Sequence, residues 1–286
     1  MKPLADWPLD ERRAIRGVFT DIDDTLTTHG TITDDALAAL AALRSAGLRV
    51  IAITGRPVGW AEPKALDWPV DAVVAENGSV ALFSGKNCQY PAEKGEVSLS
   101  KIYQLDAATR DEHSRRLRQA AARVLREVPG VNLSRDAAGR ETDIAFDHAE
   151  FDCLAPEQID AIEAVLRAEG LFTTRSSIHT HGAVNPFDKW SGAVWAARTL
   201  LGRDLPTELD HWVAVGDSGN DEAMFRHFRH SVGVANIRLA APRMRHLPRY
   251  VTISERGTGF AELAHTLLQA RTPDNCALTT ISRQWL

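Results

Sequence analysis

The sequence is poor in cysteine, in lysine and in long apolar runs. Its three cysteines, Cys88, Cys153 and Cys276, are widely spaced and form no C-x-x-C pair, so neither a disulfide framework nor a zinc site is indicated. We expect them to be buried or incidental thiols. No uncharged apolar run reaches the ~20 residues that a membrane helix needs, and the N-terminal residues lack an apolar signal core. These absences favour a cytoplasmic protein that does not bind a membrane.

The balance of charge also limits the partners. A net charge of −5 over 286 residues provides no broad basic surface for nucleic acid. Hydrophobic residues make up 44% and charged residues 25% of the chain, which is ordinary globular usage. The length is comfortable for two domains. We therefore expect a folded protein that binds a small molecule, as a monomer or a homodimer.

Both ends of the chain alternate apolar strands with helices, which predicts a parallel sheet covered on both faces. In the first part we expect strands at 17–22, 48–53, 71–75 and 79–83, and a helix at 33–45. In the last part we expect strands at 211–215, 231–234 and 250–253, and helices at 189–201, 221–228 and 259–270.

The middle of the chain lacks this rhythm. Residues 85–105 are polar and read as irregular, and helices at 108–127 and 156–169 are mixed with strands at 143–147 and 171–177. This pattern predicts a separate α+β unit. The expected fold class is thus α/β, with a discontinuous core formed by 1–83 and 182–286 and an inserted α+β cap domain at 84–181.

The first strand ends in a cluster of acids, Asp21, Asp23 and Asp24. Acids are costly in a core, so a buried strand that delivers them to its end builds a charged site there. Asp21 is the candidate nucleophile, because a carboxylate can attack phosphorus and hold the group as an acyl phosphate. Asp23 is the candidate general acid and base. An acid cluster that only caps a loop is the alternative.

A second acid cluster, Gly216-Asp217-Ser218-Gly219-Asn220-Asp221, follows the strand at 211–215. Asp21 and Asp217, with one backbone carbonyl, would suit Mg²⁺, which prefers oxygen ligands. Asn220 and Asp221 could either ligate the ion or orient its ligands. The cluster also fits the start of a helix, and both interpretations can hold because capping and ligation use different atoms.

Two further signals are weaker alone. Thr54-Gly55-Arg56 follows the second strand, where a Thr hydroxyl and backbone N–H groups can cradle a phosphate, although simple turn chemistry also explains it. Lys189 is one of six lysines and could offset the charge of Asp21 and a phosphate, unless it is a solvated surface lysine. Ligands of open parallel sheets bind outside the carboxyl ends of the strands, where all these motifs can meet.

As a set, these motifs resemble the haloacid dehalogenase-like (HAD) superfamily of hydrolases. Asp21, Asp23 and Thr25 match its D-x-D-x-T motif, Thr54 and Lys189 its second and third motifs, and the cluster at 216–221 its G-D-x-x-N-D motif. The large cap is similar to that of the type IIB, Cof- and sucrose-phosphatase-like subgroup, in which Asn77-Gly78 also has a counterpart. Asp24 stands where many members have Gly.

The resemblance implies a Rossmann-like core, an aspartyl-phosphate at Asp21 and one Mg²⁺. It implies metal ligation by the carboxylates of Asp21 and Asp217 and the backbone carbonyl of Asp23, with Asp221 a further candidate. It also makes Asn77 a candidate for substrate binding.

The leaving group would be recognised by the cap as it closes. Our substrate-binding candidates are Arg175, Ser176, Ser177, His179 and His181 in the last cap segment, with Gly55, Arg56 and Asn220 on the core side. These polar residues could instead line a domain hinge. His179 and His181 share a strand face, but a metal site there lacks a third ligand at convincing spacing.

The leading hypothesis is a Mg²⁺-dependent phosphatase that hydrolyses a small phosphate monoester, most simply a sugar or sugar-like phosphate. A phosphomutase or phosphotransferase on the same fold is the alternative, because the two differ only in how the cap excludes water. A non-catalytic binding protein is a third hypothesis, and the complete set of acids argues against it.

Overall fold

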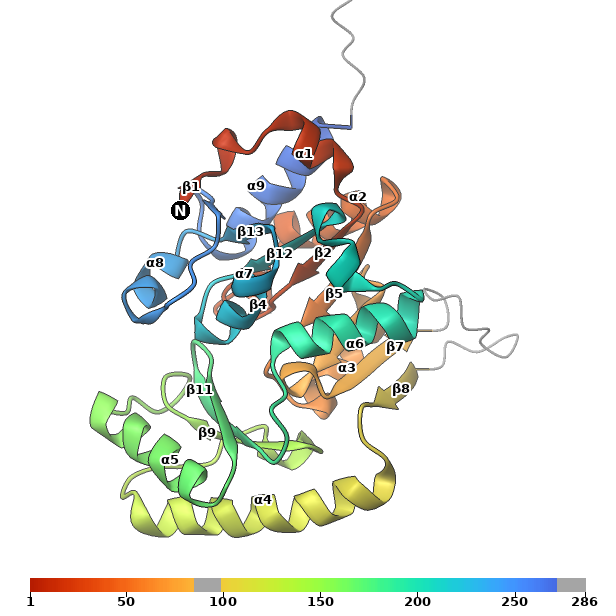
Figure 1. Ribbon diagram of the computed structural model, residues 1–286. Coiled ribbons are helices and arrows are strands. Elements are labelled where there is room, and N and C mark those ends of the chain that lie inside the picture. Colours follow the sequence, from red (N-terminus) through yellow and green to blue (C-terminus); the bar gives the residue numbers. More distant parts are fainter. Residues whose placement is uncertain (85–98, 272–286) are drawn as a thin grey trace, which may run out of the picture.

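The computed structural model describes residues 1–84 and 99–271 (Figure 1). Cys88 and Cys276 lie outside these ranges, and Cys153 is an exposed free thiol, in agreement with an incidental role. No helix in the described part of the chain has the length and apolarity needed to cross a membrane.

A nine-stranded sheet forms the larger part of the molecule, in the order β1-β14-β13-β12-β2-β5-β6-β7-β8. All neighbours from β1 to β6 are parallel, and β7 and β8 are added antiparallel at one edge. The strands are β1 (Lys2–Pro3), β2 (Gly17–Thr20), β5 (Arg49–Ile53), β6 (Ala72–Ala75), β7 (Val80–Ser84), β8 (Leu99–Tyr103), β12 (Trp212–Gly216), β13 (His230–Gly233) and β14 (Tyr250–Val251).

Helices cover both faces of this sheet. Alternate side chains of a strand point to opposite faces, so Val50 packs on one side with α2, α3 and α9, and Ile51 packs on the other with α6 and α7. These helices are α2 (Asp34–Ser45), α3 (Val58–Asp67), α6 (Lys189–Leu201), α7 (Glu222–His227) and α9 (Arg256–Gln269), and the shorter α1 (Leu9–Ala14) and α8 (Ile237–Ala240) lie at the periphery. The α/β fold with a parallel-sheet core is thereby confirmed.

A second, three-stranded antiparallel sheet has the order β10-β11-β9. Its strands are β9 (Asp143–Asp147), β10 (Phe172–Arg175) and β11 (His179–Ala183), and α4 (Ala107–Glu127) and α5 (Pro156–Ala168) pack against it. Figure 1 shows these two helices on the side of the small sheet that faces away from the large sheet. A short hairpin of β3 (Thr27–Thr28) and β4 (Thr31–Ile32) follows the first acid cluster.

Four strands, β1, β3, β4 and β8, were not predicted from the sequence, and β11 was predicted only in part. β8 lies in the segment read as irregular, and it extends the large sheet as a half-exposed edge strand paired with β7. For β11, the expectation was limited to a strand face shared by His179 and His181, because polar residues and glycine give no clear strand pattern that would set its bounds. The strand continues to Ala183, two residues past the predicted boundary at 181/182. The division into a core and a cap stays a prediction.

Candidate functional site

The two acid clusters lie at the point where the chain reverses its order across the large sheet. From β2 the strands continue in one direction to β5 and β6, whereas β12, β13 and β14 extend in the other. β2 and β12 are parallel neighbours, with Thr20 paired to Val215. Asp21 and Asp217 therefore leave the sheet side by side, at the switch point where open α/β sheets bind their ligands.

Three buried carboxylates converge there. Asp21, Asp217 and Asp221 each place a carboxylate oxygen within 4.8 Å of the others, and each side chain is buried. The hydroxyl of Thr25 lies 3.4 Å from Asp21 Oδ2 and 3.5 Å from Asp217 Oδ1. The structure thus joins segments that are almost 200 residues apart in the sequence.

Burial sets the electrostatics of this group. The pKa of Asp21 is raised to about 7 overall. Loss of solvation is the largest cause and raises it, Lys189 lowers it, and the neighbouring charges of Asp221 and Asp23 raise it. Burial also raises the pKa of Asp217 well above its ordinary value, with Asp21 and Asp221 as added causes. Buried acids that repel one another in this way need a cation to remain charged together.

Lys189 supplies part of that positive charge. Its side chain is fully buried, and its Nζ lies 2.5 Å from Asp21 Oδ1 and 2.7 Å from Asp221 Oδ1. Lys189 is the first residue of α6, whose N-cap residue Asp188 accepts a hydrogen bond from Ser191 N–H. The alternative of a solvated surface lysine is therefore wrong.

Asp221 uses both of its oxygens within the protein. Oδ1 accepts from Lys189, and Oδ2 accepts the backbone N–H groups of Asp217 and Ser218, each at 3.0 Å. Ser218 precedes the short helix Gly219–Asp221, so the helix-start interpretation of this motif is confirmed. Asp221 holds the loop and the lysine, which leaves Asp21 and Asp217 as the carboxylates better placed for a metal ion.

The turn after β5 brings the second motif to the same place. Thr54 Oγ1 accepts the N–H of Arg56 at 3.0 Å, so this hydroxyl also serves the turn. A Cβ on Gly55 would lie 3.0 Å from the ring of His181, so a larger residue here would require that ring to shift. Asn77 Oδ1 accepts from Asn220 Nδ2 at 3.3 Å. These residues form one wall of the site.

A small cavity of about 10 Å³ joins most of the predicted residues. It is lined by residues of both sheets, namely Asp21, Asp23, Gly55, Arg56, Ser176, Ser177, Ile178, His179, His181 and Asn220. Arg175 lies apart from it, because its guanidinium pairs with Asp160 and Glu163 of α5. It lines a separate cavity of about 680 Å³, which Ser177 also borders. A third cavity, of about 530 Å³, reaches Asp23 and Arg56.

Asn236 belongs to this site, although it lies in no motif recognised in the sequence. Its Nδ2 donates to Asp217 Oδ2 at 2.9 Å and to the carbonyl of Asp24 at 3.0 Å, while its Oδ1 accepts the N–H of Arg256. Asn236 thus orients Asp217. Its position in the sequence could have identified it, because Asn236 comes shortly after the end of β13, just as the acids come after β2 and β12.

Gly192 is a second residue that no sequence motif identifies. A Cβ at this position would collide with the Cα of Gly78, and a Cβ on Gly78 would lie 2.7 Å from the carbonyl oxygen of Asp188. The first turn of α6 therefore lies directly against the turn between β6 and β7. This close contact sets the position of α6 and of Lys189 at its start.

Gly192→Ala is expected to move α6 and to lower both stability and activity. An alanine normally favours a helix interior by ~1 kcal/mol over glycine, but here overpacking costs about 1–3 kcal/mol. Calorimetric melting and kcat measure the two effects. An unchanged or raised melting temperature would show that the two turns can separate freely.

Two protein-family models match parts of the chain. The protein-family model described as haloacid dehalogenase-like hydrolase matches residues 18–109. A model of sucrose-6F-phosphate phosphohydrolase matches residues 95–254, which is more than half of the chain. No protein of curated function matches the chain by sequence.

Several solved structures share the fold. Protein 0175 of Thermoplasma acidophilum has a TM-score of 0.65 at 17% identity, over 89% of this chain and 98% of its own. The sucrose-phosphatase of Synechocystis sp. PCC6803, solved with sucrose and phosphate, has a TM-score of 0.61 at 19% identity, over 89% and 98%. The C-terminal domain of C. albicans trehalose-6-phosphate phosphatase gives 0.61 at 14% identity, over 94% and 98%. At such identities the likeness shows the fold alone.

Proposed function

Because this chain belongs to the haloacid dehalogenase-like hydrolases, in the sucrose-6F-phosphate phosphohydrolase family, and is a phosphoric monoester hydrolase, we propose that it releases phosphate from a sugar or sugar-like phosphate. The observation that carries the proposal is the buried meeting of Asp21, Asp217 and Lys189 at the switch point of the sheet. The family description supports a sugar as the leaving group.

In the proposed reaction, Asp21 attacks phosphorus and becomes an aspartyl-phosphate, while Asp23 donates a proton to the departing oxygen. Asp23 then removes a proton from water, which attacks the phosphorus and frees Asp21. Lys189 keeps Asp21 charged and balances the charge that accumulates on the phosphoryl group. Thr54 and the backbone N–H groups that follow it are proposed to hold the phosphoryl oxygens.

The donors at the site fit Mg²⁺. Asp21 and Asp217 present buried carboxylate oxygens that lack enough positive charge around them, and oxygen is the ligand type that this ion prefers. We propose these two carboxylates and the backbone carbonyl of Asp23 as the protein ligands, with Asp221 and Asn236 holding them in place. When bound, the ion would offset negative charge on the phosphoryl oxygens.

Chelation with EDTA is expected to remove activity, and added Mg²⁺ is expected to restore it. The same titration should raise the melting temperature, because a cation relieves repulsion among the three buried acids and binds only the folded state. Phosphate release and thermal melting over a series of Mg²⁺ concentrations check both effects. Full turnover in excess EDTA would reject the proposed ligands.

The leaving group needs a place beside the proton donor. The cavity of about 530 Å³ contains Asp23 and is therefore the better candidate than the larger one, which borders Asp217 instead. The small cavity of about 10 Å³ that reaches Asp21 holds at most one water molecule. Substrate must therefore be admitted by movement of the small sheet, after which closure would exclude water.

A screen for released phosphate over phosphorylated sugars, polyols and nucleotides tests the proposed substrate class. We expect the largest kcat/KM among the sugar phosphates. A clear preference for nucleotides would overturn the sugar assignment while leaving the hydrolase intact.

We propose that the aspartyl-phosphate passes its phosphoryl group to water, whereas a phosphotransferase on the same fold would pass it to another hydroxyl. Hydrolysis in ¹⁸O-labelled water is expected to place label in the released phosphate. Phosphate found only on a second hydroxyl would favour the transferase, whereas unlabelled free phosphate would show that water attacks the acyl carbon of Asp21 instead of phosphorus.

A further inference from the structure

The guanidinium of Arg56 connects the two sheets. It donates to Asp23 from Nε at 3.0 Å and from Nη2 at 2.9 Å. It also donates to Glu150 from Nη2 at 2.6 Å and from Nη1 at 3.0 Å, and to Asp136 at 3.3 Å. Asp23 follows β2 of the large sheet, whereas Asp136 and Glu150 lie before and after β9 of the small sheet. One buried side chain therefore spans the boundary between them.

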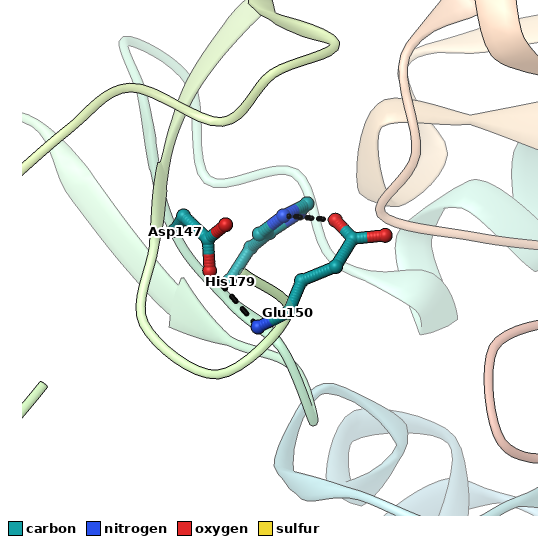
Figure 2. A group of neighbouring side chains, drawn as sticks. All are labelled: Asp147, Glu150 and His179. Atoms are coloured by element: carbon teal, nitrogen blue, oxygen red, sulfur yellow. Dashed lines mark hydrogen bonds and ion pairs between the residues drawn. The ribbon is translucent and has the colours of Figure 1, made fainter. Parts of the chain in front are cut away.

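Glu150 is itself held in place. Asp147, at the end of β9, accepts the N–H groups of Glu150 and Phe151 at 2.9 and 3.0 Å, which closes the turn. Figure 2 shows the His179 ring from β11 directed at the Glu150 carboxylate, 2.9 Å away. Burial raises the pKa of Glu150, but its contacts with His179 and Arg56 lower it, to about 2 overall, so Glu150 stays charged.

This group resembles a metal site, since oxygens of Asp147 and Glu150 and a nitrogen of His179 lie within 4.8 Å of one another. The carboxylate oxygens that would bind an ion are already engaged, however. Both oxygens of Asp147 accept backbone N–H groups, and both oxygens of Glu150 accept from Arg56. A cation would have to displace the guanidinium. The contacts therefore favour a link between protein groups over an ion.

We propose that Glu150 and His179 are positioning residues that act on Asp23 through Arg56. The guanidinium has a long, flexible stem, and a carboxylate on each side of it fixes its plane. Asp23 is thus aligned for proton transfer only when the Glu150 turn lies against the large sheet. Closure of the small sheet and alignment of the Asp23 carboxyl group therefore occur together. This inference rests on the proposed function, in which Asp23 protonates the leaving group.

The test compares esters whose leaving groups need a proton to different degrees. A sugar alkoxide requires protonation as it departs, whereas p-nitrophenolate does not. Glu150→Gln keeps the shape but places an amide N–H₂ against the guanidinium. We expect kcat/KM, which reports the steps up to leaving-group departure, to fall at least about tenfold on the best sugar phosphate of the screen. On p-nitrophenyl phosphate we expect a fall of less than about threefold.

Glu169→Gln is the matched control. Glu169 pairs with Arg123 at 2.7 Å and has a similar exposure to Glu150, at 29% and 21%, but this pair lies within the small-sheet unit and does not contact Asp23. It should change neither value. Arg56→Lys serves as a second variant if Glu150→Gln melts early, because lysine keeps the charge but cannot hold both carboxylates in one plane. It should show the same dependence on leaving group.

An equal loss on both esters, or no loss, in a variant that folds would overturn the inference and leave the proposed function standing. Wild-type protein inactive on both esters would overturn the proposed function and, with it, the role given to Glu150.

Discussion

Replacing Asp21 by Asn is expected to abolish turnover of every phosphate ester, with kcat lower by at least about 10⁴-fold. An amide oxygen is a poor nucleophile and cannot carry the acyl phosphate. The fold should survive, because the amide oxygen of the new side chain could still accept the hydrogen bond from Lys189 and one of three mutually repelling buried carboxylates is removed. Phosphate release and thermal melting on the same preparation check both statements.

Asp24→Asn is the matched control for this variant. Asp24 belongs to the same acid cluster, but its side chain is directed to Arg256, at 3.0 Å, instead of to Lys189. Its backbone has a φ of 56°, which explains why glycine often stands at this place in the family and which Asn tolerates. We expect Asp24→Asn to keep most of the activity. Full activity in Asp21→Asn would reject the assignment of Asp21 as the nucleophile.

Replacing Lys189 by Met is expected to destabilise the protein by about 3–5 kcal/mol and to remove activity. Burial lowers the pKa of this lysine, but Asp21 and Asp221 more than reverse the effect and raise it, so the side chain is charged in the fold. Met fills a similar volume, yet it leaves two buried carboxylates without their cation. Chemical denaturation gives the change in the free energy of unfolding.

Lys101→Met is the corresponding surface control. Lys101 also lies between two carboxylates, those of Glu62 and Glu141, but its side chain is 35% exposed. Exposed pairs of this kind contribute about 0–1 kcal/mol, so its loss should hardly change stability or activity. If Lys189→Met were no less stable than Lys101→Met, the charge balance assigned to the site would be incorrect.

Much of the fold could be predicted from the sequence. Apolar runs such as Val50–Ile53 indicated strands buried on both faces, and they form β5 with helices packed on each side. The acids at 21 and 217 were recognisable because each interrupts the end of such a run. Placement of these acids at one edge followed from a general property of parallel sheets.

Other features have no local pattern. β11 carries His179 and His181 on a polar strand that is stable only between β9 and β10. The sequence around Lys189 did not distinguish a buried, ion-paired lysine from an exposed one. Arg56 was expected near a substrate, yet its partners Asp136 and Glu150 lie 80 and 94 residues further along the chain and were not identified.

By itself, the sequence determined the order of strands and helices and the residues that leave the strand ends, because hydrophobic periodicity and turn chemistry act over a few neighbouring residues. Only the tertiary structure decided which oxygens of Asp221 are occupied, how Asn236 orients Asp217, and that one guanidinium joins the two sheets. Those relations depend on distances between segments far apart in the chain, and burial makes each of them strong.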